Sequence, residues 1–210
     1  MVPQMLSLFA RFWLRVRGWK VEGEPPTETC VYLAVPHTSN WDGWMLLLFA
    51  WALRLNIRWM AKHTLLKPPL GFILKSFGAV AVDRRAANGL VGQMVDALGA
   101  GENIMLCVPP EGTRSRRDFW KSGFYHIAHG AQVPICLGVL DYGRRRGGFG
   151  PLMELTGDMS ADMDRVRAFY GERGPTGRNP EQQSPILLKG EGDNVEDAAA
   201  VPSPASDALG

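Results

Sequence analysis

Short apolar runs typical of β-strands alternate with stretches of helical periodicity along most of this chain. The predicted strands span residues 30–35, 57–61, 79–82, 104–108, 135–142 and 152–156. The predicted helices span residues 41–55, 69–77, 87–100, 123–129 and 161–170. Strands separated by helices usually pair side by side in the same direction, with helices covering the sheet. The sequence therefore predicts an α/β fold with a mostly parallel or mixed central sheet flanked by helices.

The length of 210 residues is that of one domain with short appendages. A composition of 46% hydrophobic and 21% charged residues is that of a folded globular protein. The charge changes near the C-terminus, because residues 191–210 carry five acidic and no basic side chains, which leaves +7 on the remainder of a chain of net charge +2. We expect an amphipathic, membrane-contacting segment at residues 1–22, a folded domain at 23–173 and a polar, partly disordered tail at 174–210.

The three cysteines Cys30, Cys107 and Cys136 lie far apart in apolar runs. Their odd number argues against a disulfide framework, and their spacing does not match a zinc site. We expect buried thiols and no metal ion.

Residues 4–17 place apolar side chains along one stripe of a predicted helix. The stripe consists of Met5, Leu8, Phe9, Phe12, Trp13 and Val16. Arg11, Arg15 and Arg17 lie close by, and aromatic residues with arginines favour contact with a membrane surface. Packing of the stripe on the chain's own domain is the alternative. The most apolar run, residues 44–53, is about half the length that a bilayer crossing requires, and the arginines interrupt any secretory signal, so we expect neither a transmembrane helix nor a cleaved leader.

The loop after the first predicted strand holds a histidine and an aspartate with four residues between them, in the run Pro36-His-Thr-Ser-Asn-Trp-Asp42. Ligand sites of α/β sheets gather in loops beyond the carboxyl ends of strands. The Thr-Ser-Asn run favours a helix start, which would place Asp42 in the first turn and His37 just before it. A carboxylate there stays ionised and, bonded to Nδ1–H, leaves Nε2 of His37 free to act as a base. Loop and capping roles alone are the alternative.

A second loop, Pro109-Pro-Glu-Gly-Thr-Arg-Ser-Arg-Arg117, follows the strand predicted at 104–108. Gly112 permits close approach of a ligand to the backbone, Thr113 offers a hydroxyl, and Arg114 offers a planar fork that matches phosphate oxygens. Together with Glu111, these residues predict a seat for an anion. A solvated basic turn is the alternative, and it suits Arg116 and Arg117.

Two further cations follow predicted strands. Arg84 comes after the strand at 79–82, and Lys62 comes after the strand at 57–61. Parallel strands deliver such residues to one edge of the sheet, so both are candidate phosphate ligands, Lys62 with a surface position as its equal alternative. The loop 143–148 holds three arginines and is expected to be either a solvated turn or a contact for anionic groups.

Four blocks of the chain, in this order, resemble the glycerolipid acyltransferase family, which includes the lysophosphatidic acid acyltransferases. They are His37-Thr-Ser-Asn-Trp-Asp42, the run 78–84, Glu111-Gly-Thr-Arg-Ser115 with Lys121-Ser-Gly123, and Val133-Pro-Ile135. The resemblance covers residues 29–140. Two positions differ from residues common in the family, where Asn precedes the His and Phe precedes the Pro-Glu; here they are Pro36 and Pro109.

The resemblance implies an O-acyltransferase that moves a fatty acyl group from acyl-CoA or acyl-carrier protein to the free hydroxyl of a lysophospholipid, 1-acyl-glycerol-3-phosphate by default. It implies His37 as general base, Asp42 as its orienting partner, and no acyl-enzyme. It also implies substrate-binding roles for Arg84, Arg114, Glu111, Gly112 and Thr113, and an acyl pocket lined in part by Val133–Ile135. No cofactor is implied, since the thioester is a co-substrate.

The resemblance further implies phospholipid biosynthesis by a peripheral membrane protein on the cytoplasmic face of the membrane. Another lysolipid acceptor, or a non-catalytic phospholipid-binding relative, remains as an alternative. A serine hydrolase is disfavoured because the chain contains no Gly-x-Ser-x-Gly elbow. Nucleic acid is not an expected partner, because no recognised module is present and the basic residues form no long patch.

Overall fold

A seven-stranded sheet with helices on both faces forms the centre of the computed structural model, which describes residues 2–82, 89–99, 101 and 103–189. The strands are β1 (Lys20–Glu22), β2 (Cys30–Leu33), β3 (Ile57–Lys62), β4 (Ala79–Val82), β5 (Met105–Val108), β6 (Ile135–Asp141) and β7 (Arg146–Met153). The α-helices are α1 (Gln4–Val16), α2 (Asn40–Leu53), α3 (Leu70–Ser76), α4 (Gly89–Gly99), α5 (Gly123–Ala131) and α6 (Met159–Arg173), and the short 3₁₀ helices are η1 (His63–Leu66) and η2 (Pro180–Gln182). The predicted α/β class is confirmed.

The strand order is β1-β7-β6-β2-β5-β3-β4. Strands β6, β2, β5, β3 and β4 run parallel to one another, whereas β7 pairs antiparallel with β6 and carries β1 at the edge. The predicted mixed, mostly parallel sheet is therefore present. The parallel direction matters for function, because it brings the loops that follow β2, β5 and β6 to the same edge of the sheet.

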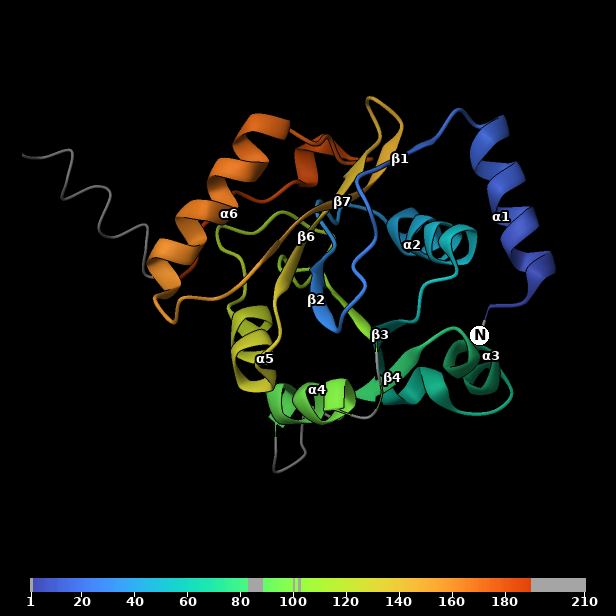
Figure 1. Cartoon of the computed structure of the whole chain (residues 1–210), viewed down its shortest axis with the longest axis horizontal. Coiled ribbons are helices and arrows are strands. Elements are labelled where there is room, and N and C mark those ends of the chain that lie inside the picture. Colours follow the sequence, from blue (N-terminus) through green and yellow to red (C-terminus); the bar gives the residue numbers. More distant parts are fainter. Residues whose placement is uncertain (1, 83–88, 100, 102, 190–210) are drawn as a thin grey trace, which may run out of the picture.

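Alternate residues of the central strands enter different cores. Val31 and Leu33 of β2 pack with α4, α5 and α6 on one face, whereas Cys30 and Tyr32 pack on the other face with Ala50 of α2. Figure 1 shows α5 and α6 on one side of the strands and α2, with α1 outside it, on the other. A strand buried on both faces has a continuous apolar sequence, which is why these strands could be predicted from the sequence. All three cysteines are buried, as expected.

Helix α1 packs one face against α2 and leaves most of its large apolar residues in solvent. The buried residues of α1 are Ser7, Ala10 and Leu14. The exposed apolar residues are Met5, Leu8, Phe9, Phe12 and Val16. Of the predicted stripe only Trp13 turns partly into the core. Packing of the stripe on the chain's own domain is therefore not observed for these five residues, and contact with a membrane stays a prediction. No helix among the described residues is long and apolar enough to cross a bilayer.

Strand β7 lies earlier in the chain than the strand predicted at 152–156, and it replaces part of the predicted basic loop. The glycines of β7 favour a loop in a sequence-based prediction, but in the structure they are required by close packing. A Cβ atom at Gly147 would lie 2.4 Å from Phe49, and one at Gly148 would lie 1.9 Å from the carbonyl oxygen of Glu22 in β1. The short strand β1 was not predicted at all. Of the loop's arginines, Arg144 pairs with Asp141 and Arg146 pairs with Glu22.

The described part of the C-terminal segment, residues 174–189, packs against the domain. Leu188 is buried in the core beside Trp120, and these two residues form an isolated parallel bridge. Ser184 is also buried. The polar composition of this segment therefore does not prevent it from covering the loops at the carboxyl edge of the sheet.

Candidate active site

The register of two neighbouring strands brings the two predicted loops together. Leu33 of β2 is paired with Val108 of β5, so His37 and Glu111 lie at similar distances beyond the ends of their strands. The backbone N–H of His37 donates a hydrogen bond to Oε1 of Glu111 at 3.0 Å, across 74 residues of sequence. Residues 36–42, the first loop, and residues 109–121, the second loop, therefore form one site.

The start of α2 holds Asp42 against His37. Ser39 is the N-cap, and its backbone N–H donates to Oδ2 of Asp42 at 2.8 Å in a capping box. The N–H of Thr38 donates to the same oxygen at 2.7 Å. Nδ1 of His37 lies 3.3 Å from Oδ2 of Asp42. The predicted turn geometry is present, and Nε2 is the nitrogen of His37 that does not face Asp42.

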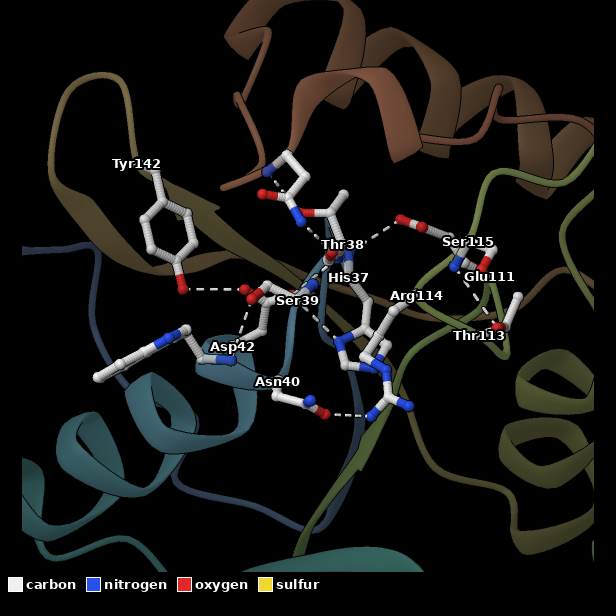
Figure 2. Close-up of polar contacts among 12 residues, drawn as sticks. His37, Thr38, Ser39, Asn40, Asp42, Glu111, Thr113, Arg114, Ser115 and Tyr142 are labelled. Carbon is white, nitrogen blue, oxygen red and sulfur yellow. Dashed lines mark hydrogen bonds and ion pairs between the residues drawn. The ribbon is translucent and has the colours of Figure 1, made fainter.

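The other carboxylate oxygen of Asp42 accepts a hydrogen bond from the hydroxyl of Tyr142 at 2.9 Å. Figure 2 shows Asp42 between Tyr142 and His37. Burial opposes ionisation of Asp42, but hydrogen bonds from His37, Ser39, Tyr142 and Thr38 outweigh it, so the pKa of Asp42 is lowered from 3.8. At neutral pH this group is therefore an anion, 3.3 Å from Nδ1 of the imidazole.

Glu111 lies behind His37 and is almost completely buried, with 1% of its surface exposed. Its Oε2 atom has no hydrogen-bond partner among the described residues. Burial raises the pKa of Glu111 to about 7, against the hydrogen bond from the His37 backbone, and the charge on Asp42 raises it further. A carboxyl group in such surroundings favours its neutral form below neutral pH.

Two cations lie at the front of the site. The guanidinium of Arg114 donates a hydrogen bond to Oδ1 of Asn40, which joins the second loop to the first turn of α2 (Figure 2). Lys121 crosses the backbone of Gly112, where a Cβ atom would come within 2.8 Å of the lysine side chain. Any larger residue than glycine at position 112 would displace Lys121.

A cleft of about 940 Å³ opens at this point. Its polar end is lined by His37, Asn40, Asp42, Gly112, Arg114 and Lys121. Its apolar part runs between α2 and the sheet, where it is lined by Tyr32, Ala34, Leu46, Phe49, Ala50, Leu55, Trp59, Met105, Cys107 and Phe149. A second apolar part is lined by residues of the opposite face, including Leu90, Phe124 and Ile127. The cleft therefore offers a charged mouth and an apolar interior, as a molecule with a phosphate and a hydrocarbon chain requires.

The remaining predicted residues fall in different places. Thr113 lies in the second loop, where its hydroxyl oxygen accepts the N–H of Ser115 at 3.5 Å. Lys62 ends β3, and its side chain lies outside the described part of the structure. Arg84 also lies outside the described residues. The run Val133–Ile135 is not among the residues that line the cleft, and Ile135 is fully buried in the core, so the cleft does not support the implied acyl-pocket role.

Three contacts of the site were not predicted. Tyr142 could have been recognised, because it follows β6 at the edge where the other site residues lie. Asn40 was read only as a candidate helix cap, and its contact with Arg114 spans 74 residues. Asn179 bonds to Thr38 across 141 residues, and no sequence pattern marks it.

Comparison with known proteins supplies the family. The profile of the Acyltransferase family matches residues 19–137, which is more than half of the chain. The structure is similar to that of PlsC from Thermotoga maritima, a 1-acyl-sn-glycerophosphate (LPA) acyltransferase, with a TM-score of 0.54 and 18% sequence identity over 95% of this chain and 80% of that chain. No curated protein matches. The matched region contains both loops, so the predicted resemblance to glycerolipid acyltransferases is confirmed and the chain belongs to the Acyltransferase family.

Proposed function

We propose that this protein transfers a fatty acyl group from acyl-CoA or acyl-carrier protein to the free hydroxyl of a lysophospholipid, with 1-acyl-glycerol-3-phosphate as the acceptor. The observation that carries the proposal is the position of the His37–Asp42 pair at the polar end of a cleft whose interior is apolar. The family match supports acyl transfer in general, and the acceptor and donor are our inference.

In the proposed mechanism, Nε2 of His37 accepts the proton of the acceptor hydroxyl while the hydroxyl oxygen attacks the thioester carbonyl. The resulting imidazolium is stabilised by the Asp42 carboxylate, which lies 3.3 Å from Nδ1. The tetrahedral intermediate then collapses, the carbon–sulfur bond breaks, and the thiolate takes up the proton. General-base help of this kind contributes about 10²–10⁴ in rate, and a thioester is reactive enough to need no covalent acyl-enzyme.

The phosphate of the acceptor is proposed to bind at the mouth of the cleft. Arg114 and Lys121 line that mouth together with His37, and the bond to Asn40 fixes the position of the Arg114 guanidinium. A planar guanidinium pairs with two phosphate oxygens at once, whereas the lysine acts as a point charge. We retain Arg84 and Lys62 as further phosphate ligands on the strength of their sequence positions, with Gly112 and Thr113 beside the glycerol part.

We also propose that the protein works at a membrane surface, with α1 as the contact. The exposed stripe on α1 is apolar, and Arg11 and Arg15 flank it. Such a helix lies in the plane of the lipid headgroups with its apolar side chains inserted. The thioester donors are made inside the cell, which favours the cytoplasmic leaflet.

The test is an acyl-transfer assay with purified protein, acyl-CoA and a panel of lysolipids, in which free thiol and product lipid are both measured. The expected result is equal formation of both with 1-acyl-glycerol-3-phosphate, and a loss of at least about 10²-fold in His37→Ala. His126→Ala is the matched control, because His126 is an exposed histidine of α5 outside the cleft. Formation of free fatty acid would show a hydrolase. Absence of thiol release by both the wild type and His126→Ala would show a lipid-binding relative.

A further inference from the structure

A segment outside the matched family region contacts both loops of the site. It consists of residues 175–188, which we call the bridging segment, and it follows α6. We propose that the bridging segment fixes the position of the two loops relative to each other, and that Asn179 in it is a positioning residue for the His37–Asp42 pair. This inference rests on the proposed acyl transfer.

The first contact of the bridging segment is with Thr38, the residue between His37 and the helix cap. The backbone N–H of Asn179 donates to Oγ1 of Thr38 at 3.2 Å, and its side-chain Nδ2 donates to the carbonyl oxygen of Thr38 at 3.1 Å. Gly177 packs against the same residue so closely that a Cβ atom there would lie 2.7 Å from Cγ2 of Thr38. Thr38 is therefore bonded to Asp42 through its own N–H and to Asn179 through its hydroxyl and carbonyl oxygens.

The second contact is with the groups that hold Asp42. The N–H of Tyr142 donates to the carbonyl oxygen of Thr176 at 2.9 Å. The guanidinium of Arg178 lies 4.9 Å from the ring centroid of Trp41 and 5.9 Å from that of Tyr142. Cation–π contacts of this kind orient the rings. The bridging segment thus touches the first turn of α2 and the tyrosine that donates to Asp42.

The third contact is with the second loop. The N–H of Arg116 donates to Oε1 of Gln182 at 3.2 Å, and the N–H of Arg117 donates to the hydroxyl of Ser184 at 3.0 Å. The N–H of Trp120 donates to the carbonyl oxygen of Leu187 at 2.7 Å. Arg116 and Arg117 have exposed side chains, as the alternative of a solvated turn requires, and their backbone N–H groups are bonded to the bridging segment.

The bridging segment is also closed on itself. The side-chain amide of Gln183 donates to the carbonyl oxygen of Pro175 at 3.1 Å and accepts the N–H of Gly177 at 3.3 Å. A closed turn holds its two ends at a fixed separation, so Asn179 and Ser184 set the distance between the loops that they bind. Misplacement of a base by about 1 Å costs about 10²-fold in rate, which makes such a brace valuable to catalysis.

The experiment compares Asn179→Ala with Glu181→Ala, an exposed residue of the same segment. The first change removes the donor to the Thr38 carbonyl and leaves the backbone bond in place. We expect kcat to fall about tenfold in Asn179→Ala, with the KM for acyl-CoA unchanged, and to stay at the wild-type value in Glu181→Ala. Gly177→Ala, which pushes on Thr38 directly, is the second variant and is expected to act in the same direction.

A structural readout separates positioning from loss of folded protein. The chain has only four histidines, so ¹⁵N labelling of histidine rings resolves His37 by comparison with His37→Ala. In the wild type we expect the proton on Nδ1, facing Asp42; in Asn179→Ala we expect a mixture of tautomers in protein that is folded by circular dichroism. A wild-type tautomer signal in Asn179→Ala, whether kcat falls or not, would overturn the positioning role. An inactive wild type would instead refute the proposed acyl transfer.

Discussion

Asp42 receives hydrogen bonds at both carboxylate oxygens, and the one from Tyr142 comes from the residue that directly follows β6, 100 residues along the chain. Tyr142→Phe removes that bond and keeps the ring that packs at the edge of Trp19. A single hydrogen bond contributes about 1 kcal/mol, which corresponds to about fivefold in rate if the whole loss falls on the transition state. We therefore expect kcat to fall about fivefold, measured by thiol release from acyl-CoA.

The control for that variant is Tyr125→Phe. Tyr125, in α5, also donates its hydroxyl to a buried aspartate, Asp162, at 3.0 Å. This pair lies on the face of the sheet opposite to α2, away from Asp42. Its removal is expected to lower the midpoint of thermal unfolding and to leave kcat unchanged. Equal effects of the two variants on kcat would show that the Tyr142 bond acts only through stability.

Glu111 predicts how stability depends on pH. Its pKa of about 7 in the folded protein exceeds the ordinary value of 4.5, so its proton favours the folded state. That contribution is fully present below pH 4.5 and is lost as the pH rises through about 7. Glu111→Gln cannot lose a proton, so its unfolding free energy relative to wild type should rise between pH 4.5 and 7 by on the order of 3 kcal/mol.

The measurement is thermal unfolding of both proteins across this pH range. For Asp42→Asn the pH series is extended below 3.8, where the opposite sense is expected, because the lowered pKa of Asp42 stabilises the fold above pH 3.8 and that stability is lost at lower pH. A difference between Glu111→Gln and wild type that stays constant with pH would contradict a raised pKa at Glu111.

The residues of the site differ in how far the sequence could reveal them. His37, Asp42 and Glu111 follow strands that are buried on both faces, and such strands are recognisable without a structure. The alignment of the two loops could also be anticipated, because parallel strands end at one edge. Asn179 could not be found, because its bond to Thr38 depends on how a polar segment returns across the whole domain after α6.

At the scale of elements, the exposed apolar stripe of α1 predicts how strongly the protein binds to membranes. Phe12 is 66% exposed in the middle of the apolar stripe of α1. Insertion of such a side chain into the lipid interface contributes on the order of 1–2 kcal/mol, so Phe12→Ser should weaken binding to anionic vesicles about fivefold or more. Sedimentation with phosphatidylglycerol vesicles measures this change.

Val21→Ser is the matched control for α1, since Val21 is an exposed apolar residue on β1. We expect it to bind vesicles as the wild type does. Equal binding by Phe12→Ser and wild type would exclude the stripe as the membrane contact and leave it as a surface for another partner.

The periodicity of α1 established the helix but not which face is buried. Apolar stripes usually mark the buried face. Here the buried face carries Ser7, Ala10 and Leu14, and the small side chains of Ser7 and Ala10 allow α1 to approach α2 closely. The prediction of strand β7 failed for a related reason. Its glycines allow contact with β1 and Phe49, yet a glycine-rich run usually predicts a loop. In both elements the neighbour, and not the local pattern, decides the structure.

At the scale of the molecule, the sheet places the site where its strand connections diverge. Strand β2 lies between β5 and β6, and the residues that follow these three strands either include His37 and Asp42 or bond to them. Beneath this edge, the cleft extends along α2 from Asn40 to Ala50, a distance of about 15 Å at the rise of an α-helix. A hydrocarbon chain in this part of the cleft would extend away from His37, with its thioester at the polar end.

This geometry predicts how chain length is selected. Ala50 lines the α2 part of the cleft, so Ala50→Phe should obstruct long chains and spare short ones. We expect the rate with palmitoyl-CoA relative to that with octanoyl-CoA to fall about tenfold or more. The ratio is taken within one variant, so a smaller folded fraction does not affect it. Ile127→Phe enlarges a residue of the other apolar part and is expected to keep the wild-type ratio. A change in Ile127→Phe alone would place the acyl chain beneath α5, on the opposite face of the sheet.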